Sequence, residues 1–153
     1  MKALRKISTS LAAIAMVGSS LAVTTTASAG VFSGLLWMQK GILLQCHVEV
    51  DLYDTPGKAI VTISPGDAFC AALSITSNDH DYTYDPITGE LVVEDVTVST
   101  ITDGDCRGDI SGIVTVNEDG SKTLTIDETI EPVNPETQTC YVWGDLFKPP
   151  HVS

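Results

Sequence analysis

The chain has 153 residues, 20 of them acidic and 8 basic, which gives a formal net charge of −12 at neutral pH. Such an acidic surface repels nucleic acid and anionic lipid headgroups, so neither is expected as a partner. Hydrophobic residues make up 43% of the chain, which argues against disorder and indicates a folded protein with a sizeable core.

Residues 1–29 are predicted to be a secretory signal peptide. A basic start that ends at Lys6 leads into an apolar stretch from Leu11 to Val23, and Ala27-Ser28-Ala29 is a small-x-small cleavage signal. The apolar stretch is too short and too rich in Ser and Thr for a membrane-spanning helix. We therefore expect a protein that is not integral to the membrane; a retained N-terminal anchor helix is the alternative.

Cleavage near Ala29 would leave residues 30–153, which we expect to form a single β domain. The part beyond the signal peptide holds 5 basic and 20 acidic residues, so its net charge deepens to −15. The expected location is secreted or extracellular, or periplasmic.

Four cysteines follow the signal peptide: Cys46, Cys70, Cys106 and Cys140. An even number in an exported chain indicates two disulfides, because an oxidising compartment lets them persist. Three pairings are possible, and we favour Cys46–Cys70 with Cys106–Cys140 because each would tie together adjacent strands. The alternative, a zinc site, is disfavoured by the lack of a CxxC pair, so no metal and no cofactor are expected.

The first strong element is a strand from Ile42 to Tyr53. Its even positions are apolar and its odd positions from Gln45 to Asp51 are polar, which is the period of a strand with one buried face. A turn at residues 55–57 and a second alternating run from Ala59 to Ile63 predict a hairpin.

The middle of the chain is less regular. Residues Phe69–Ile75 fit either a helical turn or a strand, and Asn78–Gly89 is polar and predicts a turn. Leu91–Val98 is a predicted strand whose apolar phase switches from odd to even positions. A β-bulge near Glu94-Asp95 would explain that switch.

A hairpin and a last strand complete the predicted elements. Ile110–Val116 and Leu124–Ile130 flank an Asp-Gly turn at residues 117–120, and Cys140–Phe147 forms the final strand. Strands at this spacing, with hardly any helical pattern, predict an all-β fold: a single antiparallel β-sandwich or barrel-like domain with two disulfides.

Catalytic chemistry has weak support. His47 and Glu49 share the polar face of the first long strand, where an orienting pair is conceivable, but solvated strand residues explain them more simply. His80 is expected in a loop. The chain has two tryptophans, too few to indicate the aromatic cleft of a glycoside hydrolase. We expect no catalytic residue and no enzyme.

Acidic loops raise the question of calcium, which prefers clustered oxygen ligands. The candidates are Asp79, Asp81 and Asp85 in one loop, and Asp103, Asp105 and Asp109 in another. Neither loop has the EF-hand pattern, so ordinary acidic loops are the favoured interpretation. Arg107-Gly108-Asp109 spells a cell-attachment tripeptide, a match this short being attributed to chance.

One arrangement extends over most of the chain, from Phe32 to Pro149. It consists of Lys40-Gly41-Ile42-x-Leu44-x-Cys46, Pro65-Gly66-Asp67-x-Phe69-Cys70, Gly89-x-Leu91-x-x-x-Asp95-Val96-x-Val98, Gly104-x-Cys106 and Cys140-x-Val142-x-Gly144-x-Leu146. In the order of these elements and in its four cysteines, the chain resembles the PraB family of small secreted bacterial proteins, activators of alkane oxidation.

The resemblance implies an exported, non-enzymatic accessory protein acting at the cell surface or at a hydrophobic-substrate interface. Its partner would be a hydrophobic substrate or a cell-surface component. The expected contact segment is Val31, Phe32, Leu35, Leu36, Trp37 and Met38. Two alternatives stay open: this segment is a first strand packed in the core, or it is a donated strand of an adhesin or fibre subunit assembled by β-strand addition.

Overall fold

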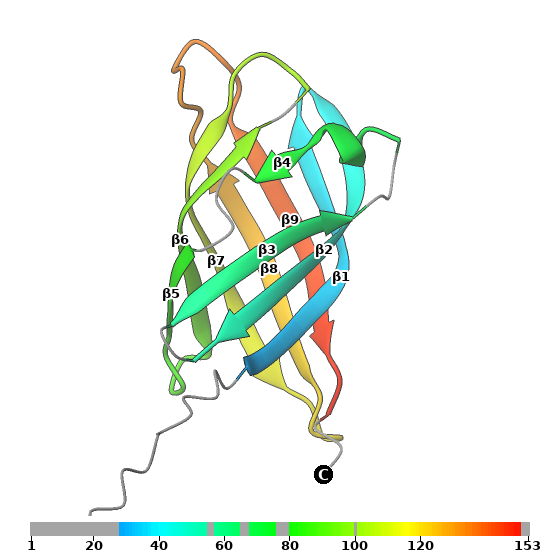
Figure 1. The fold of residues 1–153 in the computed structure, drawn as a ribbon, viewed down its shortest axis with the longest axis vertical. Coiled ribbons are helices and arrows are strands. Elements are labelled where there is room, and N and C mark those ends of the chain that lie inside the picture. Colours follow the sequence, from blue (N-terminus) through cyan, green and yellow to red (C-terminus); the bar gives the residue numbers. More distant parts are fainter. Residues whose placement is uncertain (1–27, 55–56, 65–67, 76–79, 100, 151–153) are drawn as a thin grey trace, which may run out of the picture.

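The computed structural model describes residues 28–54, 57–64, 68–75, 80–99 and 101–150, and nine strands and one short 3-10 helix lie within these ranges (Figure 1). In chain order the elements are β1 (Ser28–Lys40), β2 (Ile42–Tyr53), β3 (Lys58–Ser64), η1 (Cys70–Ala72), β4 (Ser74–Ile75), β5 (His80–Tyr84), β6 (Glu90–Ser99), β7 (Cys106–Val116), β8 (Lys122–Ile130) and β9 (Cys140–Lys148). The predicted signal peptide lies outside these ranges except for its last two residues, which begin β1.

The strands form one antiparallel sheet that closes on itself. The order is β4-β6-β5-β3-β2-β1-β9-β8-β7, and a further pairing of β6 with β7 joins the two ends. β5 pairs with the beginning of β6 and β4 with its end, so these two short strands share one position in the wall. The result is a closed barrel of eight strands, which confirms the all-β prediction and selects the barrel over the sandwich.

The core fills the inside of the barrel. On β2 the even positions from Leu44 to Leu52 are buried, as the period-two pattern predicts, and the odd positions are half-buried or exposed. Val48, Val50 and Leu52 form one cluster with Phe32 and Leu36 of β1, and Leu44 and Cys46 form a second one with Cys70 and Leu73. Burial of a large aliphatic or aromatic side chain contributes about 1.5–3 kcal/mol, so this inward row is the main source of stability.

The predicted bulge in β6 is confirmed. The β6–β7 register shifts between Val93 and Val96, which is where the apolar phase switches in the sequence. Asp95 has a φ of 54°, and it is the single non-glycine residue with positive φ in the described part of the chain. The extra residue lets both Val93 and Val96 point inward, because it absorbs the slip in alternation.

Two segments differ from their predictions. His80–Tyr84 forms strand β5 within the segment predicted to be a turn. Apart from His80, its side chains are exposed or half-buried, so the sequence carries no alternating pattern, and pairing with β6 fixes the strand instead. The ambiguous stretch after Phe69 combines both interpretations, because η1 is followed directly by β4.

Both predicted disulfides are present, Cys46–Cys70 and Cys106–Cys140. The reason given for them was wrong, since neither bridge joins neighbouring strands. Cys70 lies in η1 rather than on a strand, and the second bridge connects β7 with β9, between which β8 lies in the sheet. The first bridge therefore fastens the η1 segment to β2, and the second joins the beginnings of β7 and β9 at one end of the barrel, which we call the disulfide end.

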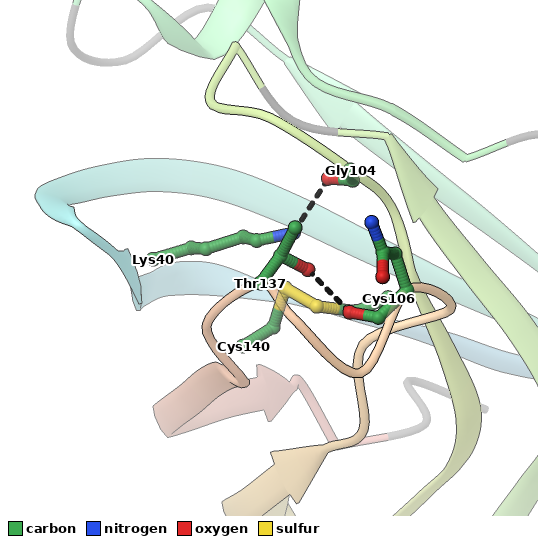
Figure 2. The surroundings of a disulfide bond; sticks show 6 residues. Lys40, Gly104, Cys106, Thr137 and Cys140 are labelled. Carbon is green, nitrogen blue, oxygen red and sulfur yellow. Dashed lines mark hydrogen bonds between the residues drawn. A yellow bond between two sulfur atoms is a disulfide. The ribbon is translucent and has the colours of Figure 1, made fainter.

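A buried lysine lies at the same end (Figure 2). Lys40, the last residue of β1, is 6% exposed, and its Nζ donates to the carbonyl of Gly104 at 2.5 Å. Gly104 has a positive φ of 82°, and a Cβ there would lie 3.0 Å from the hydroxyl of Thr137. A hydrogen bond from a charged donor is stronger than one between neutral groups, so Lys40 ties the loop before β7 to the end of β1.

We predict that replacing Cys106 and Cys140 together by serine lowers stability by about 3–4 kcal/mol, because the bridge closes a long loop of the unfolded chain. For a domain of this size that corresponds to a fall in Tm of about 10 °C or more, measurable by calorimetry. A thiol reagent should find no free thiol in the native protein. Four reactive thiols would contradict the assignment.

Candidate functional site

The most distinctive surface feature is a row of large apolar side chains on the outside of β1 and β9. Trp37 faces Trp143 in the register of the two strands, and Phe147 and Tyr141 face Ser33 and Gln39. Register partners point to the same side of a sheet, so these rings share the outer surface. We call Val31, Leu35, Trp37, Tyr141, Trp143 and Phe147 the outer aromatic face.

Three of its aromatic rings, those of Trp37, Tyr141 and Trp143, stack on each other. The ring centres of Trp37 and Trp143 are 6.3 Å apart with planes 15° from parallel, and those of Tyr141 and Trp143 are 4.6 Å apart. The Tyr141 hydroxyl donates to the Asp127 carboxylate, and this bond raises the pKa of the phenol. The rings thus form a preorganised stack, which lowers the entropy lost when such a surface makes a contact.

The predicted contact segment is divided by strand alternation. Phe32 and Leu36 point inward and are 3% and 2% exposed, whereas Leu35 is 50% and Trp37 37% exposed on the outer side. Val31 is also exposed, and Met38 is partly buried against the core. The interpretation as a core strand therefore holds for the even positions. The odd positions lie on the outside and supply half of the outer aromatic face, and their role as a contact surface stays a prediction.

Polar strands border this face. On one side β2 places His47 opposite Leu35 in the register, with Glu49 two residues further along the same strand face. On the other side β8 places Asp127 opposite Trp143. His47 is half-buried and Glu49 is exposed. The result is a mainly apolar stripe, interrupted by Ser33 and Asp145, between two polar borders.

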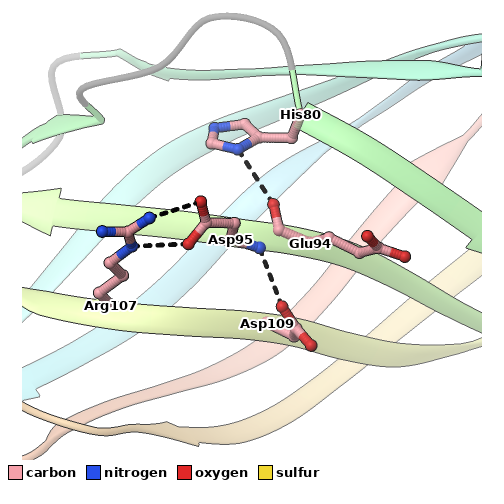
Figure 3. Close-up of polar contacts among 5 residues, drawn as sticks. All are labelled: His80, Glu94, Asp95, Arg107 and Asp109. Carbon is pink, nitrogen blue, oxygen red and sulfur yellow. Dashed lines mark hydrogen bonds and ion pairs between the residues drawn. The ribbon is translucent and has the colours of Figure 1, made fainter.

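The tripeptide Arg107-Gly108-Asp109 lies in β7 and not in a presenting loop (Figure 3). Arg107 donates to both carboxylate oxygens of Asp95, at 2.6 and 2.8 Å, and the Asp109 carboxylate accepts the Asp95 N–H at 2.9 Å. The hydrogen bond from Arg107 lowers the pKa of Asp95 and raises that of Arg107. The side chains of Asp95, Arg107 and Asp109 thus hold the bulge of β6 against β7.

The prediction that His80 lies in a loop is wrong, because His80 begins strand β5. It is 3% exposed, and its Nδ1 lies 3.2 Å from the carbonyl oxygen of Glu94, beside the bulge. Its Nε2 is buried without a hydrogen-bond partner in the described part of the chain. Neither this contact nor the Arg107–Asp95 pair carries a signal in the sequence, because the partners lie 12 to 14 residues apart.

The acidic residues proposed as calcium ligands do not gather into a site. Within the described ranges no group of three or more His, Cys, Asp or Glu side chains is placed to hold a metal ion, and Asp79 lies outside these ranges. Asp81 instead pairs with Lys58 at 2.6 Å, and Asp85 accepts the N–H of Ile87 at 2.8 Å.

Comparisons with protein-family models, with curated proteins and with solved structures find no match. Among the described residues no helix combines the length and apolarity needed to cross a membrane. The resemblance to the PraB family stays a prediction.

The bulge yields a matched pair of variants. Asp95→Ala and Asp95→Gly both remove the carboxylate, but only alanine is strained at a φ of 54°. We expect Asp95→Ala to unfold about 5 °C below Asp95→Gly in a thermal melt. Equal melting temperatures would contradict a strained bulge.

The pairing of Asp95 with Arg107 also makes the stability of the fold depend on pH. Its pKa is lower in the folded protein, so the carboxylate stabilises the fold above its unfolded pKa, about 3.9, and loses this effect as pH falls through the lower folded value. Asp95→Asn should therefore lower Tm by a few degrees at about pH 7 and by less at about pH 2. A difference in Tm that is unchanged between the two conditions would rule out the pairing with Arg107 as its cause.

Proposed function

We propose that the protein is an exported, non-enzymatic accessory protein that acts at the cell surface or at the boundary between water and a hydrophobic substrate. The role is that of the alkane-oxidation activators that the sequence resembles. The outer aromatic face would be the part that contacts the apolar phase. The observation that carries this proposal is the stacked row of rings on β1 and β9 of an otherwise acidic protein.

The energy available from this face is sufficient for adsorption. Its four most exposed members are between 37% and 50% exposed: Val31, Leu35, Trp37 and Phe147. Complete burial of such a side chain contributes about 1.5–3 kcal/mol. Because these side chains are already at least half buried, covering the exposed part of each contributes about 1 kcal/mol. A total near 4–5 kcal/mol gives reversible adsorption, while the net charge of −15 keeps the rest of the protein in water.

The disulfides support an exported location. Two bridges between all four cysteines persist in an oxidising compartment, which is where the predicted signal peptide would deliver the chain. Secretion into the medium, or retention in the periplasm or on the cell surface, is part of this proposal.

The alternative, a fibre subunit built by β-strand addition, has less support. Val31–Met38 would be the donated segment, but this part of β1 is hydrogen-bonded to β2 on one side and to β9 on the other within its own barrel. Donation would require removal of an interior strand and loss of Phe32 and Leu36 from the core. Fibres in negative-stain images of the exported protein would favour this alternative, and a persistent monomer in size-exclusion chromatography would exclude it.

Growth tests the biological role. A deletion strain should grow more slowly than its parent on a long-chain alkane but equally well on succinate, and purified protein added to the medium should restore growth. Growth of the deletion strain equal to that of its parent on the alkane as well as on succinate would contradict the proposed function.

Adsorption tests the proposed surface. We expect Trp37→Ser combined with Trp143→Ser to reduce partition onto alkane droplets about tenfold or more, because about 1.4 kcal/mol of lost contact already corresponds to a factor of ten. The matched control is Ile87→Ser with Val133→Ser, which removes two apolar side chains that are 93% and 61% exposed elsewhere. If both double variants lose adsorption equally, the outer aromatic face has no special role.

A further inference from the structure

Two of the five basic residues beyond the expected signal peptide lie side by side. Lys122, at the start of β8, faces Lys148, at the end of β9, in the register of these strands. The other three lie at separate places: Lys40 contacts Gly104, Lys58 pairs with Asp81 and Arg107 pairs with Asp95. In a protein of such negative charge, a pair of adjacent cations identifies the end of the barrel opposite the disulfide end. We call it the lysine end.

A pocket of about 100 Å³ opens at the lysine end, between the two lysines. Its floor is apolar and consists of Phe32, Leu52, Leu91 and Val114. Asp54 and Tyr82 lie on the rim, and the Tyr82 hydroxyl is 3.2 Å from Asp54, to which it donates. A cationic rim above an apolar floor fits a molecule with a negative head and a hydrocarbon tail.

The two ammonium groups repel each other, and an anion between them would be attracted to both. Burial lowers the pKa of Lys148, and the charge of Lys122 lowers it further, while Asp54 acts in the opposite direction. Lys148 also lies over the ring of Phe32, with its Nζ 6.0 Å from the ring centre. A carboxylate between the two ammonium groups would form charge-assisted hydrogen bonds with both.

The floor leads toward the interior of the barrel. Leu91, which is 2% exposed, lines both this pocket and an inner cavity of about 40 Å³. The inner cavity is lined almost entirely by apolar side chains such as Leu36, Val50 and Leu124. An eight-stranded barrel is wide enough to hold one small ligand, so a tail that displaces the Leu91 side chain can extend along the barrel axis.

We propose that the lysine end binds an aliphatic carboxylate, with its head group between Lys122 and Lys148 and its tail on the floor toward Leu91. Asp54 on the same rim offsets part of the positive charge, which favours a monovalent head group over a dianion such as an alkyl phosphate. The site is separate from the outer aromatic face, and the inference does not depend on the proposed function.

Titration calorimetry of the unmodified exported protein tests the ligand class without any substitution. Octanoate and decanoate should bind, and octanol, octylamine and octyl phosphate should each bind about tenfold more weakly or not at all, because they lack a monovalent negative head. Octylamine binding as tightly as octanoate, or no heat from either carboxylate, would overturn the proposal.

Variants then test the position of the site. Lys122→Met and Lys148→Met should each weaken octanoate binding about tenfold or more, while Lys58→Met, which removes the same charge outside the pocket, should leave it unchanged. Leu91→Ala should shift the preference from octanoate toward decanoate, since it joins the pocket to the inner cavity. Thermal melts confirm that each variant is folded.

The two surfaces can be separated in one comparison. Trp37→Ser with Trp143→Ser should keep the full affinity for octanoate even where adsorption to alkane droplets is lost. Octanoate binding that falls with the tryptophan variant and persists in both lysine variants would place the ligand on the outer aromatic face and refute the lysine-end site.

Discussion

The pairing of β6 with β7 closes the sheet, and the rest of the structure depends on this closure. For the sheet to close, β6 must pair with β7 and keep its apolar side chains inside the barrel along its whole length. The apolar phase of its sequence, however, slips by one position. Asp95 absorbs that slip in a left-handed conformation, and Arg107 and Asp109 hold it from β7. With the seam closed, every strand has one side toward the core and one toward solvent, so an apolar residue on the outer side cannot be buried within the barrel.

This constraint explains why the protein has two apolar regions of different kinds. The outward rings of β1 and β9 are left on the surface, where they form the outer aromatic face. The inward residues fill most of the barrel. Space remains above the floor at the lysine end, in the inner cavity that Leu91 also lines, and in a smaller pocket of about 20 Å³ beside Lys40. The two disulfides and Lys40 fasten the opposite end, so access to the interior is expected at the lysine end.

The sequence predicted those features that depend on local pattern. The alternation in Ile42–Tyr53 and the phase slip at Glu94-Asp95 are confirmed. The pairing of the cysteines is confirmed as well, although the reason given for it, a link between adjacent strands, was wrong. The choice between sandwich and barrel was left open, and strand β5 and the convergence of Lys122 with Lys148 were missed. Each depends on partners that are distant in sequence or on side chains that are polar in isolation, and periodicity contains no information about either.

The central claim, that the outer aromatic face contacts an apolar phase, is tested most directly by tryptophan fluorescence. The chain's two tryptophans, Trp37 and Trp143, both lie in this face, so the intrinsic emission reports on it alone. With droplets of a brominated alkane, the account predicts a blue shift, quenching by the bromine and protection from a water-soluble quencher. Emission that stays unchanged while the protein is bound to the droplets would contradict it.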